Sequence, residues 1–166
     1  DVRVRRAIAH AIDRKAFIDG VLEGLAKPIG SHFAPTDAGY VDLTGQYPYD
    51  PAKARALLAE AGFPNGFGVT LDCVNIAWRE AVCQASAAML SQVGIRTQLR
   101  SSPTNQFFPK LSQATASFVE FGWTPATDAW STLNGLFRTF DPAGGGCAMT
   151  EAVVHVRPVV EAGGGK

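Results

Sequence analysis

The sequence predicts an α/β fold with a small, mostly parallel sheet flanked by helices. Residues 68–100 show a strand pattern, a long helix pattern and a second strand pattern in turn, which is the order of a βαβ unit. Size and composition agree, because 166 residues make about one domain and a hydrophobic content of 46% suffices for a core. Fifteen basic residues balance fifteen acidic ones, and this zero net charge argues against a general nucleic-acid binder.

An amphipathic helix and a long irregular connection begin the chain. Apolar side chains recur at helical spacing over residues 2–25, and Gly20 and Gly24 weaken the last turns. Residues 26–49 are rich in Pro, Gly and Tyr and show no regular pattern. Connections of this length usually have a function. We therefore expect the segment to line a ligand cleft, to cover a neighbouring domain or to form an ordered surface wrap.

The next helix carries the clearest local signals. Over residues 51–61, Asp50 suits the N-cap, Pro51 the first helical position and Gly62 the residue that follows the helix. After it, the βαβ unit is expected to be parallel and right-handed. The further predicted elements are a strand at 68–75, helix 78–93, a strand at 95–100, helix 104–114, a third strand at 117–122 and helix 127–139.

The three cysteines are Cys73, Cys83 and Cys147, and an odd number cannot form a closed disulfide framework. Free cysteines are usually small buried hydrophobic residues, which suits Cys73 in an apolar strand pattern and Cys83 in a helix pattern. A Cys73–Cys83 bridge stays open as an alternative if the compartment is oxidising.

The sequence shows no enzyme motif and predicts no catalytic residue, metal site or cofactor. His10, His32 and His155 are scattered, and His10 is expected to be either solvated or internally hydrogen-bonded. The sequence holds no G-x-S-x-G elbow, no H-E-x-x-H and no Ca²⁺ loop.

One segment, residues 121–130, is a candidate binding site. It follows the third predicted strand, and ligands of open α/β sheets sit at the carboxyl ends of strands. Gly122 allows close backbone approach, Trp123 offers a flat apolar wall, and Asp128 could bind a cationic group. The alternative is that Trp123 belongs to the core and Asp128 caps the next helix.

Four motifs then resemble one family. Residues 4–14 resemble V-R-x-A-[IL]-x-x-A-I-[DN]-R, residues 49–63 resemble Y-D-P-x-K-A-x-x-L-L-x-E-A-G-[YF], residues 89–95 resemble L-x-x-[IL]-G-I, and Gly122-Trp123 is the fourth. In this order they are similar to the peptide/nickel solute-binding proteins, family 5, which are the extracytoplasmic receptors of ABC importers. The resemblance covers residues 1 to about 140.

The resemblance implies two lobes that close on a solute, of which residues 1–143 are most of the second. It places the signal peptide and first lobe before Asp1, the protein in the periplasm or another extracytoplasmic space, and its partners as a dipeptide or oligopeptide and an ABC permease. Residues 144–166 depart from the family and are expected to be a divergent or truncated tail.

The resemblance also assigns the site residues. The segment Gly122, Trp123, Thr124 matches the one that lines the solute cleft in relatives. Peptide-binding relatives place an acid three residues after the Trp to pair with the peptide ammonium. That position is Ala126 here, and Asp128 is the nearest acid, so a shifted acid or a different solute is expected.

Two other functions remain open from the sequence. One is a small α/β enzyme that pairs Cys147 or Cys83 with a histidine. The other is a fragment that self-associates, because surface that the first lobe covers would be exposed.

Overall fold

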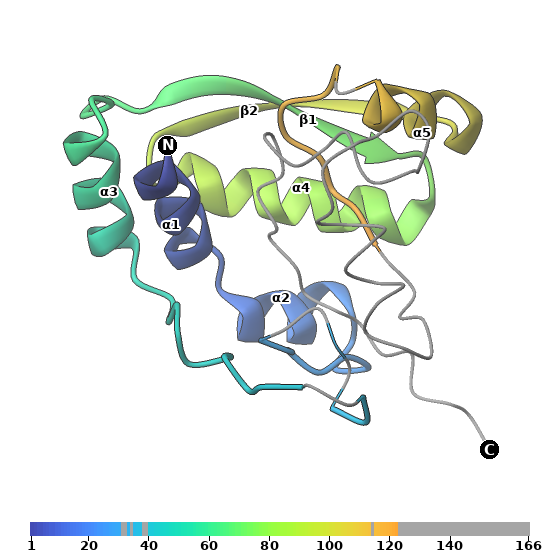
Figure 1. Cartoon of the computed structure of the whole chain (residues 1–166), viewed down its shortest axis with the longest axis horizontal. Coiled ribbons are helices and arrows are strands. Elements are labelled where there is room, and N and C mark those ends of the chain that lie inside the picture. Colours follow the sequence, from blue (N-terminus) through green and yellow to red (C-terminus); the bar gives the residue numbers. More distant parts are fainter. Residues whose placement is uncertain (31–32, 34, 38–39, 114, 123–166) are drawn as a thin grey trace, which may run out of the picture.

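A computed structural model describes residues 1–30, 33, 35–37, 40–113 and 115–122 (Figure 1). The predicted helix 127–139 and the tail 144–166 lie outside these residues. The elements in chain order are helix α1 (Val2–Ala11), helix α2 (Arg14–Val21), helix α3 (Pro51–Glu60), strand β1 (Phe67–Val74), helix α4 (Ala77–Ser91), strand β2 (Ile95–Ser102) and helix α5 (Thr104–Ser112).

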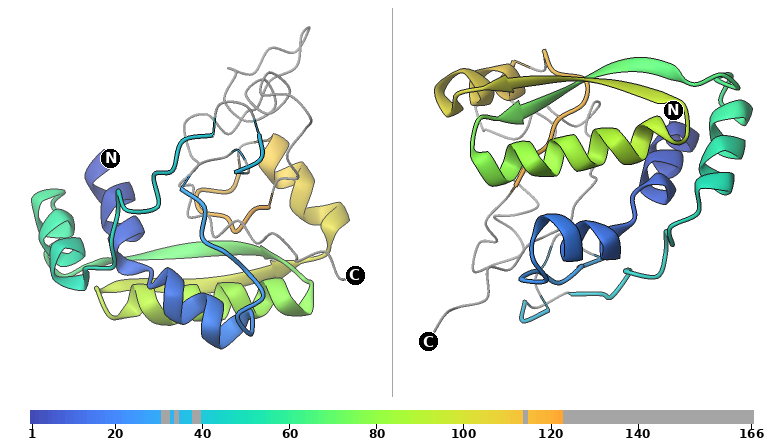
Figure 2. Two further views of the ribbon diagram at one scale, coloured as in Figure 1. Left: turned by 90° about the horizontal axis from the view of Figure 1, so that it is seen from below. Right: turned by 180° about the vertical axis from the view of Figure 1, so that it is seen from behind.

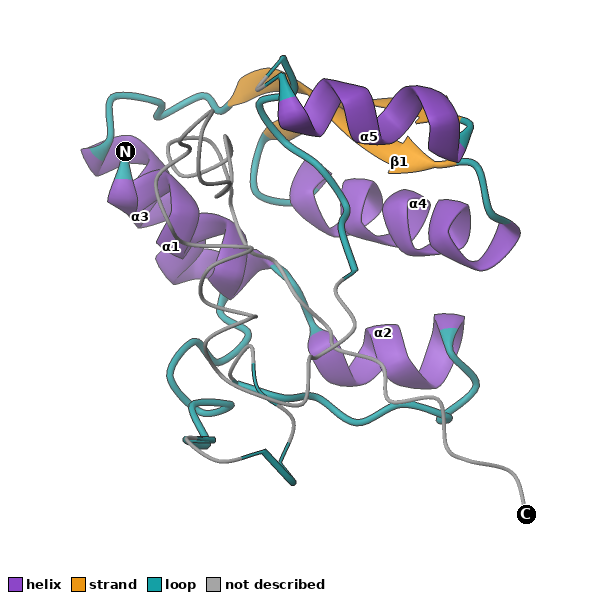
Figure 3. Ribbon diagram, turned by 45° about the vertical axis from the view of Figure 1, so that its right-hand side comes forward, coloured by secondary structure: helices purple, strands orange, loops and turns teal. Residues whose placement is uncertain are grey.

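Strands β1 and β2 pair in parallel, from Phe67 opposite Ile95 to Val74 opposite Ser102. Helix α4 connects them, so the predicted α/β class and the parallel βαβ unit are confirmed. Helices α4 and α5 cover opposite faces of β1 (Figure 3). Helices α1 and α3 lie side by side near the amino end of β1, and α2 lies beside α4 (Figure 2).

Side chains of β1 alternate between the two faces, as they must in a strand. Leu71 and Cys73 belong to the main core with Cys83 and Leu90 of α4 and with α1 and α3. Val74 faces the other way and packs with Phe107 and Leu111 of α5 in a second apolar cluster. The strand is therefore buried on both sides, which is typical of parallel sheets.

The predicted helix over residues 2–25 is wrong, because the structure divides it into α1 and α2. Ile12 is extended, with φ −94° and ψ 113°, and it is buried. The carboxylate of Asp13 accepts a hydrogen bond from the Ala16 backbone N–H at 3.0 Å and caps a new helix. An Asp side chain that bonds to a nearby backbone N–H favours a helix start over a helix interior. The apolar spacing therefore continues along the sequence, although the helix axis changes direction at Ile12.

Helix α3 matches its signals. Asp50 accepts a hydrogen bond from the Lys53 backbone N–H at 2.9 Å, Pro51 is the first helical residue, and Gly62 has φ +93°. A positive φ is strained for a residue with a side chain. Residues 26–30, 33, 35–37 and 40–49 form no helix or strand, which agrees with the predicted irregular connection.

The predicted third strand is only partly present. Residues 117–122 join β1 through one parallel bridge between Asp72 and Val119. The backbone N–H of Asp72 donates to Phe118 O at 3.0 Å, and the backbone N–H of Glu120 donates to Asp72 O at 2.9 Å. The side chains still alternate, since Phe118 enters the main core and Val119 and Phe121 pack on the α5 side. The alternation of side chains along residues 117–122 was therefore predictable from the sequence, but the segment pairs with β1 through a single bridge.

A disulfide joins Cys73 of β1 to Cys83 of α4, and both residues are buried. The sequence left open whether these cysteines are buried free thiols or form a bridge, and the structure shows that they are buried and bridged. The bond closes a short loop with a sequence separation of 10. By chain entropy such a bond stabilises the fold by roughly 2–3 kcal/mol.

Asp72 links the sheet to its surroundings through a buried carboxylate, 2% exposed. Arg100 of β2 donates from Nε and Nη2 to its two oxygens at 2.5 and 2.6 Å. Lys110 of α5 approaches Oδ1 at 3.4 Å and also donates to Ser102 Oγ at 3.0 Å. The cluster therefore ties β1, β2 and α5 together.

Replacing both cysteines, as in Cys73→Ala with Cys83→Ala, is expected to lower the free energy of unfolding by roughly 2–3 kcal/mol. Urea unfolding followed by circular dichroism measures the change. Dithiothreitol should lower the stability of the wild-type chain and leave that of the double variant unchanged. A wild-type chain that is indifferent to reductant contradicts the bridge.

Asp72→Asn is expected to lower the free energy of unfolding by about 1–3 kcal/mol, because it weakens the charged hydrogen bonds of a buried carboxylate. The control is Asp19→Asn, which removes the exposed α2 ion pair with Lys15 and should change stability much less, because solvent screens this pair. Equal effects of the two substitutions in urea unfolding would show that the Asp72 cluster has no special role.

Candidate functional site

The candidate site lies at the carboxyl edge of the sheet. Here β1 ends at Val74, β2 ends at Ser102 and the segment 117–122 ends at Gly122. Helix α4 starts at the same edge with Ala77. Parallel strands bring their carboxyl ends together, and this is where open α/β sheets bind ligands.

Gly122 lies beside Arg79 of α4. A Cβ built on Gly122 would be 2.7 Å from Arg79 Nη2, which is too close for a side chain. Gly122 is itself exposed. Next to it, Trp78 is 51% exposed, and the Arg79 guanidinium carbon lies 5.3 Å from its ring centroid. The edge thus combines bare backbone, an aromatic face and a guanidinium.

Arg79 is paired with Glu120 of the same edge. Nη2 donates to Oε1 at 3.1 Å, and Nε lies 2.9 Å from Oε2 as an ion pair without hydrogen-bond alignment. The two side chains are only 11% and 16% exposed. Burial raises the pKa of Glu120, and the positive charge of Arg79 offsets part of that effect. Glu120 is therefore engaged with Arg79 rather than presented to solvent.

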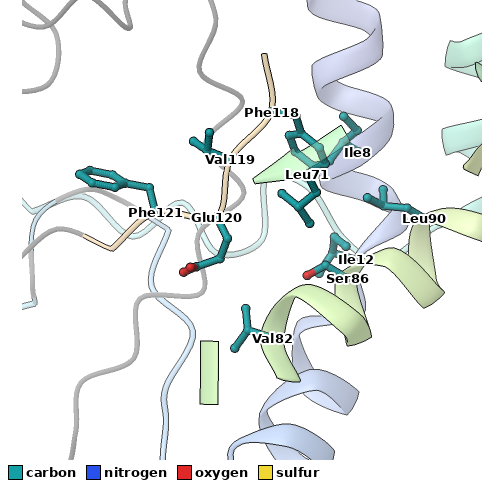
Figure 4. Close-up of a pocket in the computed structure, with 10 residues that line it drawn as sticks. All are labelled: Ile8, Ile12, Leu71, Val82, Ser86, Leu90, Phe118, Val119, Glu120 and Phe121. Carbon is teal, nitrogen blue, oxygen red and sulfur yellow. The ribbon is translucent and has the colours of Figure 1, made fainter. Parts of the chain in front are cut away.

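A small cavity lies between α1, α4, β1 and residues 118–121 (Figure 4). Its lining is apolar apart from Ser86 and Glu120. The volume of about 30 Å³ matches the space of one water molecule and is far too small for a solute. The cavity is part of the core and does not form a binding site.

A larger, open groove of about 450 Å³ lies between α2 and the connection that follows it. Thr44 and Tyr49 of this connection line part of the groove, and the expectation that residues 26–49 line a ligand cleft stays a prediction. Its cations already have partners. Lys15 pairs with Asp19 at 2.5 Å, and Arg14 Nη1 donates to Tyr47 O at 2.7 Å.

The sequence-predicted site residues are only partly described. Gly122 lies at the carboxyl edge as expected, while Trp123, Thr124 and Asp128 lie outside the described residues. Sequence reasoning missed Arg79 and Glu120. Their opposite charges were visible, but nothing local indicated that α4 and the segment 117–122 would place them together.

Two residues considered for the alternative Cys/His enzyme, His10 and Cys83, are already engaged in the structure. His10 is buried, its Nδ1 is 2.7 Å from Pro48 O and its ring meets Tyr47 edge-on at 5.5 Å between centroids. It is the internally hydrogen-bonded histidine that the sequence allowed. Cys83 is disulfide-bonded, so it offers no thiol for catalysis. His32, His155 and Cys147 lie outside the described residues.

The described part of the chain lacks two further features. No cluster of His, Cys, Asp or Glu there could hold a metal ion. Within the same residues, every helix is too short or too polar to cross a bilayer.

Glu120 gives stability a pH dependence with a definite sign. Because its folded-state pKa is raised above 4.5, the stabilising effect is full below that pH and is lost as the pH rises through the raised pKa. Relative to Glu120→Gln, the wild-type chain should lose stability as the pH rises from about 4 through the raised pKa, with a slope of at most about 1.4 kcal/mol per pH unit. Urea unfolding across this range measures it. A difference that is constant, or that grows in favour of the wild type, contradicts the burial of Glu120.

Two known proteins are similar to much of this chain. Heme-binding protein A of Haemophilus influenzae is 31% identical over 135 residues, which are 75% of this chain and 24% of that protein. Glutathione-binding protein GsiB of Escherichia coli strain K12 is 38% identical over 105 residues, 63% of this chain and 20% of that protein. The chain thus spans a fifth to a quarter of these relatives.

Solved structures show the same fold. The ABC transporter-associated periplasmic binding protein DppA of Helicobacter pylori, in complex with the peptide STSA, matches with a TM-score of 0.77 and 29% identity. The match covers 82% of this chain and 27% of that one. Residues 1–144 match the family described as bacterial extracellular solute-binding proteins, family 5, middle part. The chain belongs to family 5 of the bacterial extracellular solute-binding proteins.

Proposed function

We propose that this chain is the second lobe of an ABC-importer receptor, which captures a peptide or similar small solute between two lobes. The observation that carries the proposal is the position of Gly122, exposed at the carboxyl edge and directly before Trp123. Residues 1–143 would form this lobe and residues 144–166 a separate tail. The family match over residues 1–144 supports that division.

The mechanism proposed is closure on the solute without chemistry. Gly122 brings backbone close to the solute, Trp123 and Thr124 supply a flat apolar wall and a hydroxyl, and Asp128 receives a cationic group. The open and closed forms differ by rotation of the lobes about their hinge. No cofactor is required for this role.

The solute is proposed to be a dipeptide, an oligopeptide or a peptide-like molecule. Two of the relatives support this class, because one is named for glutathione and the other was solved with a peptide. The carboxylate of Glu120 at this edge is already paired with Arg79. Asp128 is therefore the acid proposed for an ammonium group.

The partner proposed is an ABC permease, and the location an extracytoplasmic space such as the periplasm. The buried Cys73–Cys83 disulfide supports the location, because such bonds persist in oxidising compartments. Exposed apolar side chains near the carboxyl edge, Ile76 and Trp78, suit a surface that the first lobe covers.

Trp123→Ala is expected to weaken solute binding at least about tenfold, because an aromatic wall contributes about 1.4 kcal/mol or more to such a site. Calorimetric titration with glutathione and with a set of dipeptides and tetrapeptides measures it. The wild-type affinity should itself be low, since one lobe supplies part of the contacts.

The control is Phe63→Ala, which removes an exposed aromatic ring at the opposite end of β1. Equal losses in the two variants, or none in Trp123→Ala, would contradict the proposed site. Light scattering of the wild-type chain over a concentration series shows whether self-association covers the edge instead.

A further inference from the structure

We infer that Arg79 and Glu120 are positioning residues of the carboxyl edge. The guanidinium is held by Glu120 and lies against Gly122, close to where a Cβ at that position would be. The pair thereby fixes the backbone of residues 118–122. The link to solute binding rests on the proposed function, whereas the positioning itself does not.

The segment is attached to the sheet both through its backbone and through a side chain. Among the described residues, its backbone hydrogen bonds to β1 are those at Phe118 O and Glu120 N, both to Asp72. The Glu120 carboxylate adds a side-chain attachment, because it reaches Arg79 of α4 through two contacts at 2.9 and 3.1 Å. The ion pair thus ties the segment to α4 as well as to β1.

Arg79 is a firm anchor because its own element is fixed to the sheet. It lies within the loop that the Cys73–Cys83 disulfide closes, about one helical turn before Cys83. The neighbouring Val82 is buried in the core. The first turn of α4 therefore moves with β1, and it holds Glu120 at a set distance from the strand.

Gly122 completes the arrangement. A Cβ at this position would lie 2.7 Å from Arg79 Nη2 and 3.6 Å from its Cζ. An arginine head group usually swings away from such a contact at little cost. Here such a movement strains the pair with Glu120, whose carboxylate is largely buried. A side chain at position 122 therefore competes with the ion pair for the same space.

A double-mutant cycle tests this coupling in the 166-residue chain. Gly122→Ala and Arg79→Met are made singly and together, and amide hydrogen exchange is measured over residues 118–122 and over β1. In the presence of Arg79, Gly122→Ala should speed exchange in the segment about tenfold. In the Arg79→Met background, where the clash is gone, the further effect should be under about threefold.

The matched control is Gly20→Ala, because a Cβ there meets no atom within 4 Å. It should leave exchange in the segment unchanged. Additive effects in the cycle would overturn the inference, and so would equal acceleration throughout β1, since that is a general loss of stability. The non-additive result confined to residues 118–122 supports it.

Glutathione titration of the same variants separates this inference from the proposed function. If segment exchange responds as expected and glutathione or peptide binding weakens with it, both stand. If exchange responds but the variants bind glutathione or peptide as well as the wild-type chain does, the pair still positions the segment and the proposed site is wrong. If exchange does not respond, the positioning inference fails whatever the binding result.

Discussion

Asp72 lies in the carboxyl half of β1, where the strand is buried and where this residue is paired on both edges. Its backbone pairs with Arg100 in β2 and bonds to Phe118 and Glu120 on the other side. Its side chain pairs with Arg100 and Lys110. A buried carboxylate must have such partners, because an unpaired one costs several kcal/mol. This requirement ties β2 and α5 to β1, while the backbone of the same residue holds the segment 117–122.

A second constraint acts from the opposite face of the sheet. The Cys73–Cys83 disulfide and the apolar core hold α4 against β1 and orient its first turn toward the edge. Arg79 then reaches Glu120 across the end of the segment. The two ion-pair systems therefore lie on opposite sides of β1, one with α5 and one with α4.

Much of the fold was predictable because local chemistry and packing agree. Asp50 and Gly62 mark the ends of α3 with signals that need no tertiary context. The helix over residues 2–25 could not be predicted correctly, since its apolar spacing continues across the break at Ile12. There the competing cap at Asp13 decides the path of the backbone. Such a competition between a helix interior and an N-cap is settled by what the neighbouring turns pack against.

The sequence by itself determined the α/β class, the parallel order of the two strands and the resemblance to family 5. These rest on periodicity, caps and motif order, all of which are local along the chain. Only the tertiary structure decided which charges meet. Glu120 pairs with Arg79 and Asp72 with Arg100 and Lys110, over sequence separations of 41, 28 and 38 residues. Contacts over such distances depend on how helices seat on the sheet, because the pairing energy is gained only after packing has removed the groups from water.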